Sequence, residues 1–586
     1  LDTYFSATTK TLTNKTLTSP IVSGLQLSDS GFSVEGSSAD ANETTVSFTN
    51  PTADRTITFP NATGNVAVFA TAPTTAITDG SAGHFLKTDG SGTLSFAAAG
   101  ADLYLANASS ATANTVTGAN AIGIGSNNTA SGESSLSFGV NATASAVGAF
   151  AAGRNTTASG SDSFAFGSSA VASGSNTLSI GSNTDATGNS SVAIGNTAQS
   201  VGAYSVALAN SYASGDYSFA AAIGNNTNSY GAQGASSVAI GFLAKATGNN
   251  SYALGEGAIA SANNAMALQD STASGSSSFA AGEAAVASGN SSISIGGYSD
   301  ATGTNALAIG AGGTQSAGTN SVAIGYAYAS GDTSFAASIG DYTSSYGATG
   351  DNSIAMGSLA KATSTYAVAI GYSAQSTSVG TVAIGAQNTA SGQYSTAIGR
   401  SNTASGNYAA VIGSRDSTAS ADNSFASGQE AKATIRGQKV HASGQFATKG
   451  DAQGSIFILR ADTTDATATV LTTNNSTAST DNQIVLQNES AMSFTGTVVV
   501  REDASDGDDY AGWEIKGVIM RQGQASDTTL GVGIVNSLYH TSGLANAAVA
   551  LSADTTNGGL KIQVTGIAST NLNWVATVHT SEVVNA

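Results

Sequence analysis

The feature that most constrains the fold of this chain is a glycine that returns every 14 residues. It stands at positions 125, 139, 153, 167, 181 and 195, and the same beat continues, with a few replacements and insertions, to Gly444. The repeating unit reads S-h-A-h-G-x-x-A-x-A-S-G-x-x, where h is a large apolar residue, and 23 such units can be counted. Short repeats of this kind stack into solenoids, in which each unit contacts only its neighbours.

Two large apolar residues alternate with a small one before each glycine, as in Val192 and Ile194 or Val322 and Ile324. A period of two is typical of a β-strand. The second half of the unit is made of small residues, which suit a crowded interior or a close contact between chains. We expect the recurring glycine to be a turn residue with positive φ. The sequence therefore predicts an all-β solenoid of 14-residue coils over residues 119–450, roughly 110 Å long at the usual strand spacing.

A coil of only 14 residues has little room for a core of its own. We therefore expect further burial against neighbouring copies, with a homotrimer as the natural solution. In that arrangement Val192, Ile194, Val322 and Ile324 point into a core that three chains share.

A longer repeat is superimposed on the short one, because residues 212–247 return at a constant offset of 116. Both copies carry the same inserted residues. Insertions in solenoids usually form loops on one face, so Tyr230 and Tyr346, each in a Ser-Tyr-Gly segment, are candidates for exposed receptor-binding aromatics. The alternative is that the duplicated segments have a structural role only and bind no receptor.

The composition excludes several classes of function. Only 9% of the residues are charged, the net charge is -19 and there is no cysteine. Binding to nucleic acid or to anionic lipid needs clustered Lys and Arg, so neither is expected. Disulfides and thiolate metal sites are excluded, and no cofactor is expected. No apolar run reaches the roughly 18 residues of a membrane helix, so we expect no membrane insertion. Disorder is not expected either, because 41% of the residues are apolar and they recur periodically.

The flanks of the repeat predict two further β modules. Short alternating strands at 46–48, 57–59 and 66–68 indicate a small N-terminal module over residues 1–98, followed by a linker over 99–118. After residue 450 the 14-residue repeat stops. Conventional strands with polar turns then predict a β-sandwich over residues 451–586; they are expected at 456–459, 483–486, 496–500, 513–520, 547–551, 560–564 and 573–578.

Few residues are candidates for chemistry. Trp513 and Trp574 lie in alternating apolar strands, which favours the core, with a receptor-binding platform as the alternative. An acidic stretch indicates a solvated hairpin turn, and a calcium site is the alternative; it contains Glu502, Asp503, Asp506, Asp508 and Asp509. The histidines belong to no metal or nucleophile motif; they are His84, His441, His540 and His579. The acidic residues of the solenoid are sparse and recur at no matched position, so we expect no catalytic residues.

The repeat S-V-A-I-G-x-x-A-x-A-x-G, as it begins at 191–195 and 321–325, resembles the head repeat of trimeric autotransporter adhesins, the YadA-like heads. This resemblance implies a trimeric left-handed parallel β-roll that binds host surfaces. No heptad stalk follows the repeat, which makes a bacterial surface adhesin the alternative assignment and not the first one.

The flanks resemble tail-fibre proteins of tailed bacteriophages, including phages of marine cyanobacteria. The similar segments are residues 11–20, residues 54–60 with their continuation to Val68, and the stretch from Trp513 to Ala576. This resemblance implies a virion protein whose N-terminal end joins tail, baseplate or capsid proteins and whose C-terminal tip binds a host surface glycan or protein. We accordingly expect binding specificity in residues 451–586. A polysaccharide-cleaving tailspike is the less favoured alternative.

Overall fold

The computed structural model describes residues 113–341, 343–504 and 507–585 in full, and before them only the backbone of four strands. These strands are β1 (Gly31–Val34), β2 (Thr44–Ser47), β3 (His84–Thr88) and β4 (Leu94–Ala98). β1 and β2 pair antiparallel, and β3 pairs with β4. The predicted strand at 46–48 overlaps β2, whereas those at 57–59 and 66–68 lie outside the described residues. The chain divides into two units, of which the first is N-terminal and the second contains the whole repeat region and the C-terminal module.

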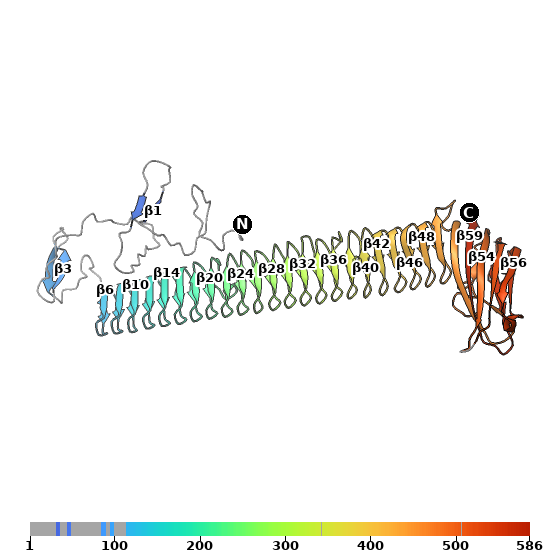
Figure 1. Cartoon of the computed structure of the whole chain (residues 1–586). Coiled ribbons are helices and arrows are strands. Elements are labelled where there is room, and N and C mark those ends of the chain that lie inside the picture. The colour runs from blue at the N-terminus through green and yellow to red at the C-terminus, as the bar shows by residue number, and fades with distance from the viewer. Residues whose placement is uncertain are drawn as a thin grey trace. The chain divides into compact units, whose positions relative to one another are not determined.

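Most of the second unit is a solenoid of about 23 parallel coils, as the repeat predicted (Figure 1). Each coil has a first strand, such as β16 (Val192–Asn196), and a two-residue second strand, such as β17 (Gln199–Ser200). The first strands run from β6 (Ile122–Ser126) to β50 (Lys439–Ser443) and pair in register with those of the coils on either side. Val192, for example, lies opposite Leu178 and Val206. The equivalent residues of successive coils therefore form columns along the solenoid.

The recurring glycine has the positive φ that the sequence predicted, 126° at Gly139 for instance. Its place differs from the prediction, because Gly139 still belongs to strand β8 (Leu136–Val140). The left-handed turn residue comes two positions later, at Asn127 and Asn141 in neighbouring coils. Asn tolerates this conformation better than most residues. The turn is also stabilised between coils, since Asn127 Nδ2 donates to Asn141 Oδ1 at 2.8 Å.

The interior of each coil is filled by alanine and serine. In the coil that begins at Ser191, the buried side chains are Ser191, Ala193, Ala198 and Ser200. The hydroxyls of Ser200 and Ser205 satisfy each other at 2.7 Å. Small side chains are needed here because the two strands of a coil lie too close together for larger ones. Of the two interpretations of these residues, the crowded interior is the correct one.

The duplicated insertions alter this interior in two places. Ile223 and Ile339 are fully buried where other coils have smaller residues. Tyr230 and Tyr346 follow the inserted residues, and both are half-buried against the alanine core. The expectation that these tyrosines are exposed on loops was therefore wrong, because their rings fill space that the longer coils open.

The C-terminal module consists of two sheets around one hydrophobic core. The larger sheet contains five long strands in the order β51, β59, β54, β55 and β56. Their bounds are β51 Ala452–Thr463, β54 Ser490–Glu502, β55 Tyr510–Arg521, β56 Thr528–His540 and β59 Leu572–Val584. β51 also pairs with β50, the last first strand of the solenoid. One sheet therefore runs without a break from the solenoid into the C-terminal module.

The smaller sheet covers one face of the larger one and completes the predicted β-rich module. It contains β52 (Ala468–Val470), β53 (Ile484–Val485), β57 (Ala548–Asp554) and β58 (Gly559–Thr565). Two single turns of 3-10 helix, Ala525–Asp527 and Ser542–Leu544, lie in the connections. All seven strands expected from the sequence overlap observed ones. Two observed strands were missed. β52 has only three residues, and in β56 Gly531 and Gly533 interrupt the apolar pattern and most side chains are exposed.

Candidate functional site

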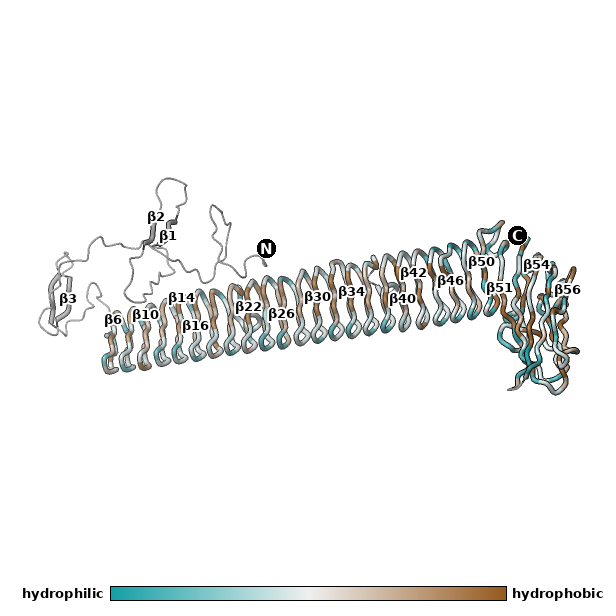
Figure 2. The backbone as a smooth tube through the Cα atoms, in the orientation of Figure 1, coloured by the Kyte–Doolittle hydropathy of each residue, from teal (hydrophilic) through white to brown (hydrophobic). Residues whose placement is uncertain are grey.

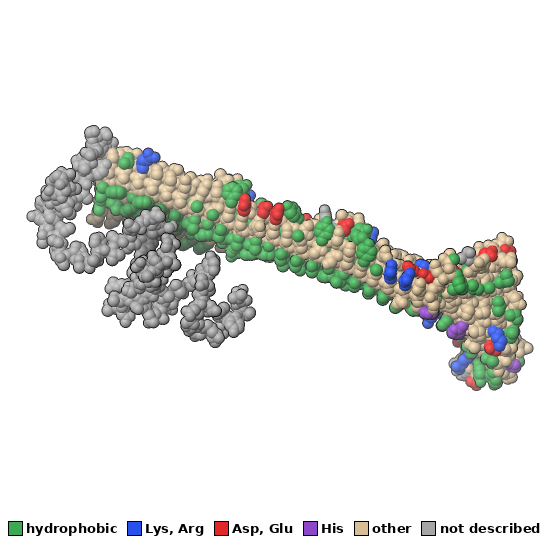
Figure 3. Space-filling model, turned by 90° about the horizontal axis from the view of Figure 1, so that it is seen from above, with side chains coloured by type: hydrophobic (Ala, Val, Ile, Leu, Met, Phe, Trp, Pro, Cys, Tyr) green, Lys and Arg blue, Asp and Glu red, His purple; other side chains and the backbone are tan. Residues whose placement is uncertain are grey.

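The large apolar side chains of the first strands lie on the outside of the solenoid. Ile194 is 37% exposed and Ile324 38%, while Phe138 and Phe166 reach 52%. Since successive coils are in register, these side chains form continuous columns, and Figure 3 shows a green band of hydrophobic side chains along one side of the solenoid. The tube in Figure 2 has a hydrophobic segment in coil after coil. We call the outward side of the first strands the apolar face.

The apolar face explains why Val192, Ile194, Val322 and Ile324 alternate with alanine. Ala193 points into the coil and is fully buried, whereas its neighbours on either side point out of it. A single chain therefore leaves these four side chains half-buried or exposed, and their burial in a core shared between copies stays a prediction. Exposed apolar patches larger than a few hundred Å² usually mark interaction surfaces.

The two tryptophans are core residues of the C-terminal module. Trp513 is 5% exposed and Trp574 is 1% exposed, and their rings stack with centroids 5.5 Å apart. Trp574 Nε1 donates a hydrogen bond to Thr463 Oγ1 at 2.9 Å, which satisfies the only polar atom of its ring. Neither ring lies on the surface, so these positions do not indicate an exposed receptor-binding platform.

The acidic stretch lies in the loop between β54 and β55. Asp503 and Asp508 are exposed, and the hairpin is closed by Glu502, whose N–H donates to Asp509 O at 2.9 Å. Asp506 lies outside the described residues. Among the residues that the structure describes, no three His, Asp or Glu side chains are grouped as metal ligands. The calcium alternative therefore gains no support from the described part of the loop.

Two other loops lie beside the acidic one, which the sequence did not reveal. Thr541 donates its N–H to Tyr510 O at 3.0 Å, and Asp503 donates its N–H to Asn571 O at 2.8 Å. Residues 503–504 and 507–509 therefore lie beside the loops 541–547 and 568–571 at one end of the larger sheet. We call them the loop cluster. Loops carried by a rigid scaffold are the usual place for recognition.

Histidines that are far apart in the sequence lie on the same face of the continuous sheet. His441 is on β50 and His579 is on β59, and both side chains are exposed. Ser427 Oγ lies 3.1 Å from His441 Nδ1. His540 ends β56, and the side chain of His84 lies outside the described residues. No metal or nucleophile motif emerges among the described three.

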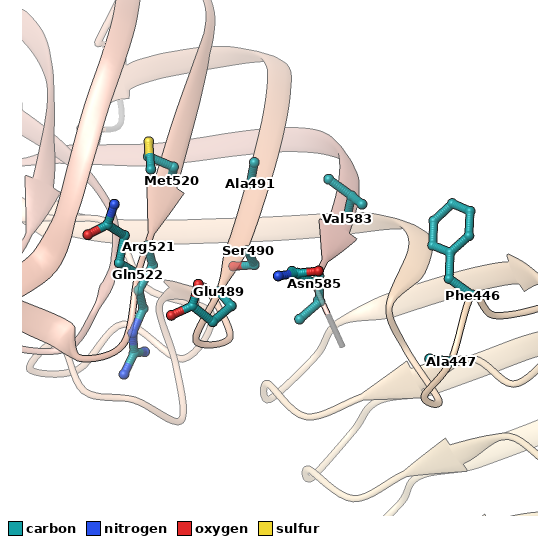
Figure 4. Close-up of a pocket in the computed structure, with 11 residues that line it drawn as sticks. Phe446, Ala447, Glu489, Ser490, Ala491, Met520, Arg521, Gln522, Val583 and Asn585 are labelled. Atoms are coloured by element: carbon teal, nitrogen blue, oxygen red, sulfur yellow. The ribbon is translucent and has the colours of Figure 1, made fainter.

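A cleft of about 610 Å³ lies where the solenoid meets the C-terminal module. Ala491, Met520 and Val583 line it from neighbouring strands of the larger sheet, and Phe446 lines it from the loop between β50 and β51 (Figure 4). That loop is held by Asp451, which accepts hydrogen bonds from three consecutive backbone N–H groups at 2.7–2.8 Å. Burial acts to raise the pKa of Asp451, but these hydrogen bonds outweigh it and hold the pKa below its ordinary value.

The solenoid matches a known protein family. The YadA head domain repeat matches twelve overlapping segments between residues 117 and 415. A comparison with curated proteins found no match. The matched segments are residues 117–139, 130–156, 158–184, 186–208, 232–251, 246–268, 273–299, 287–312, 301–327, 348–374, 376–402 and 390–415.

The two longest gaps between the matched segments, at 209–231 and 328–347, coincide with the duplicated insertions, so the family pattern fails where the coil is longer. The described part of the chain contains no helix that is both long and apolar enough to cross a bilayer.

Adhesin-type repeats and a solenoid fold suggest a structural protein and not an enzyme. Together, the matched repeats and the stacked coils support a YadA-like protein of the adhesin type.

Proposed function

We propose that this chain is the subunit of a homotrimeric fibre that extends from a phage virion and attaches to the host cell through its C-terminal module. The observation that carries the proposal is the apolar face. A solenoid whose own interior holds mainly alanine and serine presents its larger apolar side chains to the outside, coil after coil.

The energy available from this face favours association. Burying a Val or Ile side chain fully stabilises a protein by about 1.5–3 kcal/mol. Association costs about 4–15 kcal/mol in lost freedom of movement. With about 23 coils in register, a gain of even 1 kcal/mol per coil exceeds that cost. Three copies are proposed because YadA head repeats suggest homotrimers.

The mass of the purified chain in solution tests the trimer. Light scattering coupled to size-exclusion chromatography should give three times the mass of one chain, over a range of loading concentrations. A monomeric mass at micromolar concentration would contradict the proposal, because the apolar face would then be stable in water.

The attachment role rests on the flanks. The segments at 11–20, 54–68 and 513–576 resemble phage tail fibres. This resemblance favours a virion protein joined to tail, baseplate or capsid proteins at its N-terminal end. The proposed ligand at the other end is a host surface glycan or protein. Each contact can be weak, since three linked copies on one particle raise the effective affinity without new contacts.

A bacterial surface adhesin is the second candidate, and the YadA head repeats fit it equally well. Immunogold labelling separates the two. Antibody raised against the purified chain should decorate fibres on phage particles and leave uninfected cells unlabelled. Label on the envelope of uninfected cells would favour the bacterial adhesin and contradict the virion assignment.

A further inference from the structure

The larger sheet of the C-terminal module has two apolar faces, of which the smaller sheet covers only one. Residues such as Phe457, Val498, Ile515 and Trp574 point inward and form the core. The alternate residues point outward, and we call that side the outer tip face. Its large apolar side chains are 37–54% exposed; they are Ile456, Ile458, Val499, Val518, Met520, Val532, Ile534, Val575 and Val583.

These side chains are neighbours in space because the five strands are in register. Val575 lies opposite Val499 on the adjacent strand. Val518 lies opposite Val532. A β-sheet presents alternate residues on one side, so the exposed apolar residues of β51, β54, β55, β56 and β59 belong to one surface.

The outer tip face continues the apolar face of the solenoid. Phe425 on β48 (Phe425–Gln429) lies opposite Lys439 on β50, and Lys439 lies opposite Ile456 on β51. All three residues are on the outward side, while Val440 and Ser455 between them are buried. The outward side of the sheet is therefore continuous from the solenoid into the C-terminal module, with the charged Lys439 of β50 between the apolar residues of β48 and β51.

Of the charged groups on the outer tip face, Lys516 and Glu514 are paired with each other, whereas Arg460 and Arg501, near the ends of β51 and β54, form no ion pair with a described residue. Lys516 Nζ lies 3.5 Å from Glu514 Oε1, and Asn536 Nδ2 donates to Glu514 Oε2 at 3.0 Å. An interface that buries paired charges avoids the cost of desolvating unpaired ones. The cleft between the solenoid and the C-terminal module lies beside this surface. Phe446, which is 77% exposed, lines the cleft and is held there by the loop that Asp451 stabilises.

We infer that the outer tip face is covered by a second copy of this chain, so that the C-terminal modules, like the coils, pack against one another. The inference rests on the proposed function, since it takes several copies to lie side by side along the solenoid. A second copy is the occupant because the covered surface is continuous with the apolar face and is mainly aliphatic. Exposed ring faces, which a saccharide would require, are confined to one end of β55 and β56, where Tyr510 and Tyr539 stack with centroids 5.2 Å apart.

Thiol labelling of the full-length chain tests this directly, because the sequence has no cysteine and each introduced thiol is the only one. Val499→Cys and Val575→Cys place the thiol on the outer tip face. Ala466→Cys is the matched control, exposed in the loop between β51 and β52 of the same module. Each variant is first checked for the mass and melting temperature of the parent chain. The thiol is then reduced, the reducing agent is removed, and the rate of labelling with a maleimide is measured.

We expect the native Val499→Cys and Val575→Cys variants to label about tenfold more slowly than Ala466→Cys, and all three to label equally fast in denaturant. If the chain is trimeric but both tip thiols label as fast as the control, the outer tip face is open and the inference is overturned, while the trimer of the solenoid stands. If the chain is monomeric, both the inference and the proposed trimer are overturned.

Discussion

Gly167 and Gly413 follow the same sequence pattern, yet the structure gives them different places, because Ser414 and not Gly413 lies opposite Gly399 of the preceding coil. A Cβ on Gly167 would overlap the carbonyl oxygen of Gly181 in the next coil, whereas a Cβ on Gly413 would meet nothing within 4 Å. Both residues have positive φ, 133° and 63° respectively. The recurring glycine is therefore needed for two separate reasons, its backbone conformation and the close approach of the next coil.

Alanine substitutions separate these two reasons. Gly413→Ala should cost only the conformational penalty of about 1–2 kcal/mol. Gly167→Ala should cost about 3 kcal/mol or more, since the overlap with Gly181 forces the backbones of two coils apart. Thermal melting of the two variants measures the difference. Equal melting temperatures would show that the close approach of the coils is not limiting.

Asp185 and Asp300 each begin a second strand, β15 (Asp185–Ala186) and β31 (Asp300–Ala301), beside Gln199 and Gln315 in the next coils. Burial raises the pKa of both carboxyl groups. Among the described residues, Asp185 Oδ1 is buried without a hydrogen-bond partner. A raised pKa in the folded state means that ionisation opposes folding once the pH exceeds the unfolded pKa, near 3.8.

Asp185→Asn should therefore raise the melting temperature at pH 7, because it removes a buried charge that has no partner. The gain should shrink towards pH 3, where the parent carboxyl is neutral as well. Asp300→Asn should behave alike, and Asp508→Asn, on an exposed loop, is the control. Melting curves from pH 3 to pH 8 follow the effect; a gain that does not change with pH would mean that ionisation is not its cause.

At the scale of the element, the two sides of the first strand of each coil carry different kinds of residue. Its inward side carries residues such as Ala193, and its outward side carries Val192 and Ile194. The two sides face different partners, the coil interior and the proposed neighbouring copies. Substitutions on the two sides should consequently have different effects.

Ala193→Asp places a charge inside the coil and should disrupt that coil whether or not other copies are present. Ile194→Asp places the charge on the apolar face and should weaken association by several kcal/mol per trimer, while a single coil tolerates it. Analytical ultracentrifugation and circular dichroism distinguish the outcomes: loss of β-structure for Ala193→Asp, and lower mass with retained β-structure for Ile194→Asp. An unchanged mass for Ile194→Asp would exclude the apolar face as the contact.

At the scale of the whole molecule, the proposed roles divide along the chain. The solenoid consists of one 14-residue repeat and provides length, while the C-terminal module lacks this repeat and carries the loop cluster. If copies cover the outer tip face, the loop cluster at the end of the larger sheet becomes the part of this module to which we assign receptor recognition.

Removing the exposed acids of the loop cluster tests this assignment. The double substitution Asp503→Ala and Asp508→Ala should reduce binding of the full-length chain to host cells about tenfold, because it removes two exposed carboxylates from the loop cluster. Glu256→Ala, an exposed acid on the solenoid, should leave binding unchanged. Binding is measured by flow cytometry of cells with labelled protein. Full binding by the tip variant with loss in Glu256→Ala would move recognition to the solenoid, where Tyr230 and Tyr346 would be examined next.

The sequence by itself determined the solenoid, because a fixed 14-residue period with alternating large and small residues fits stacked short strands and little else. It also determined most strands of the C-terminal module, whose alternation follows from having one buried face. It did not determine which side of the first strand is the interior. Alternation states that two sides differ, but only the spacing between the two strands of a coil decides that alanine, and not isoleucine, fits between them.

The tertiary structure alone decided where the candidate sites lie. Tyr230 and Tyr346 pack against the alanine core because inserted residues widen their coils, and no local pattern reports that width. Residues 503–504 and 507–509 meet residues 541–547 and 568–571 only because their strands are neighbours in one sheet. The same sheet joins β50 to β51 and so carries the apolar face into the C-terminal module. Such contacts depend on strand order, and strand order in a sheet of long-range pairs is set by packing between distant segments and not by the residues of any one strand.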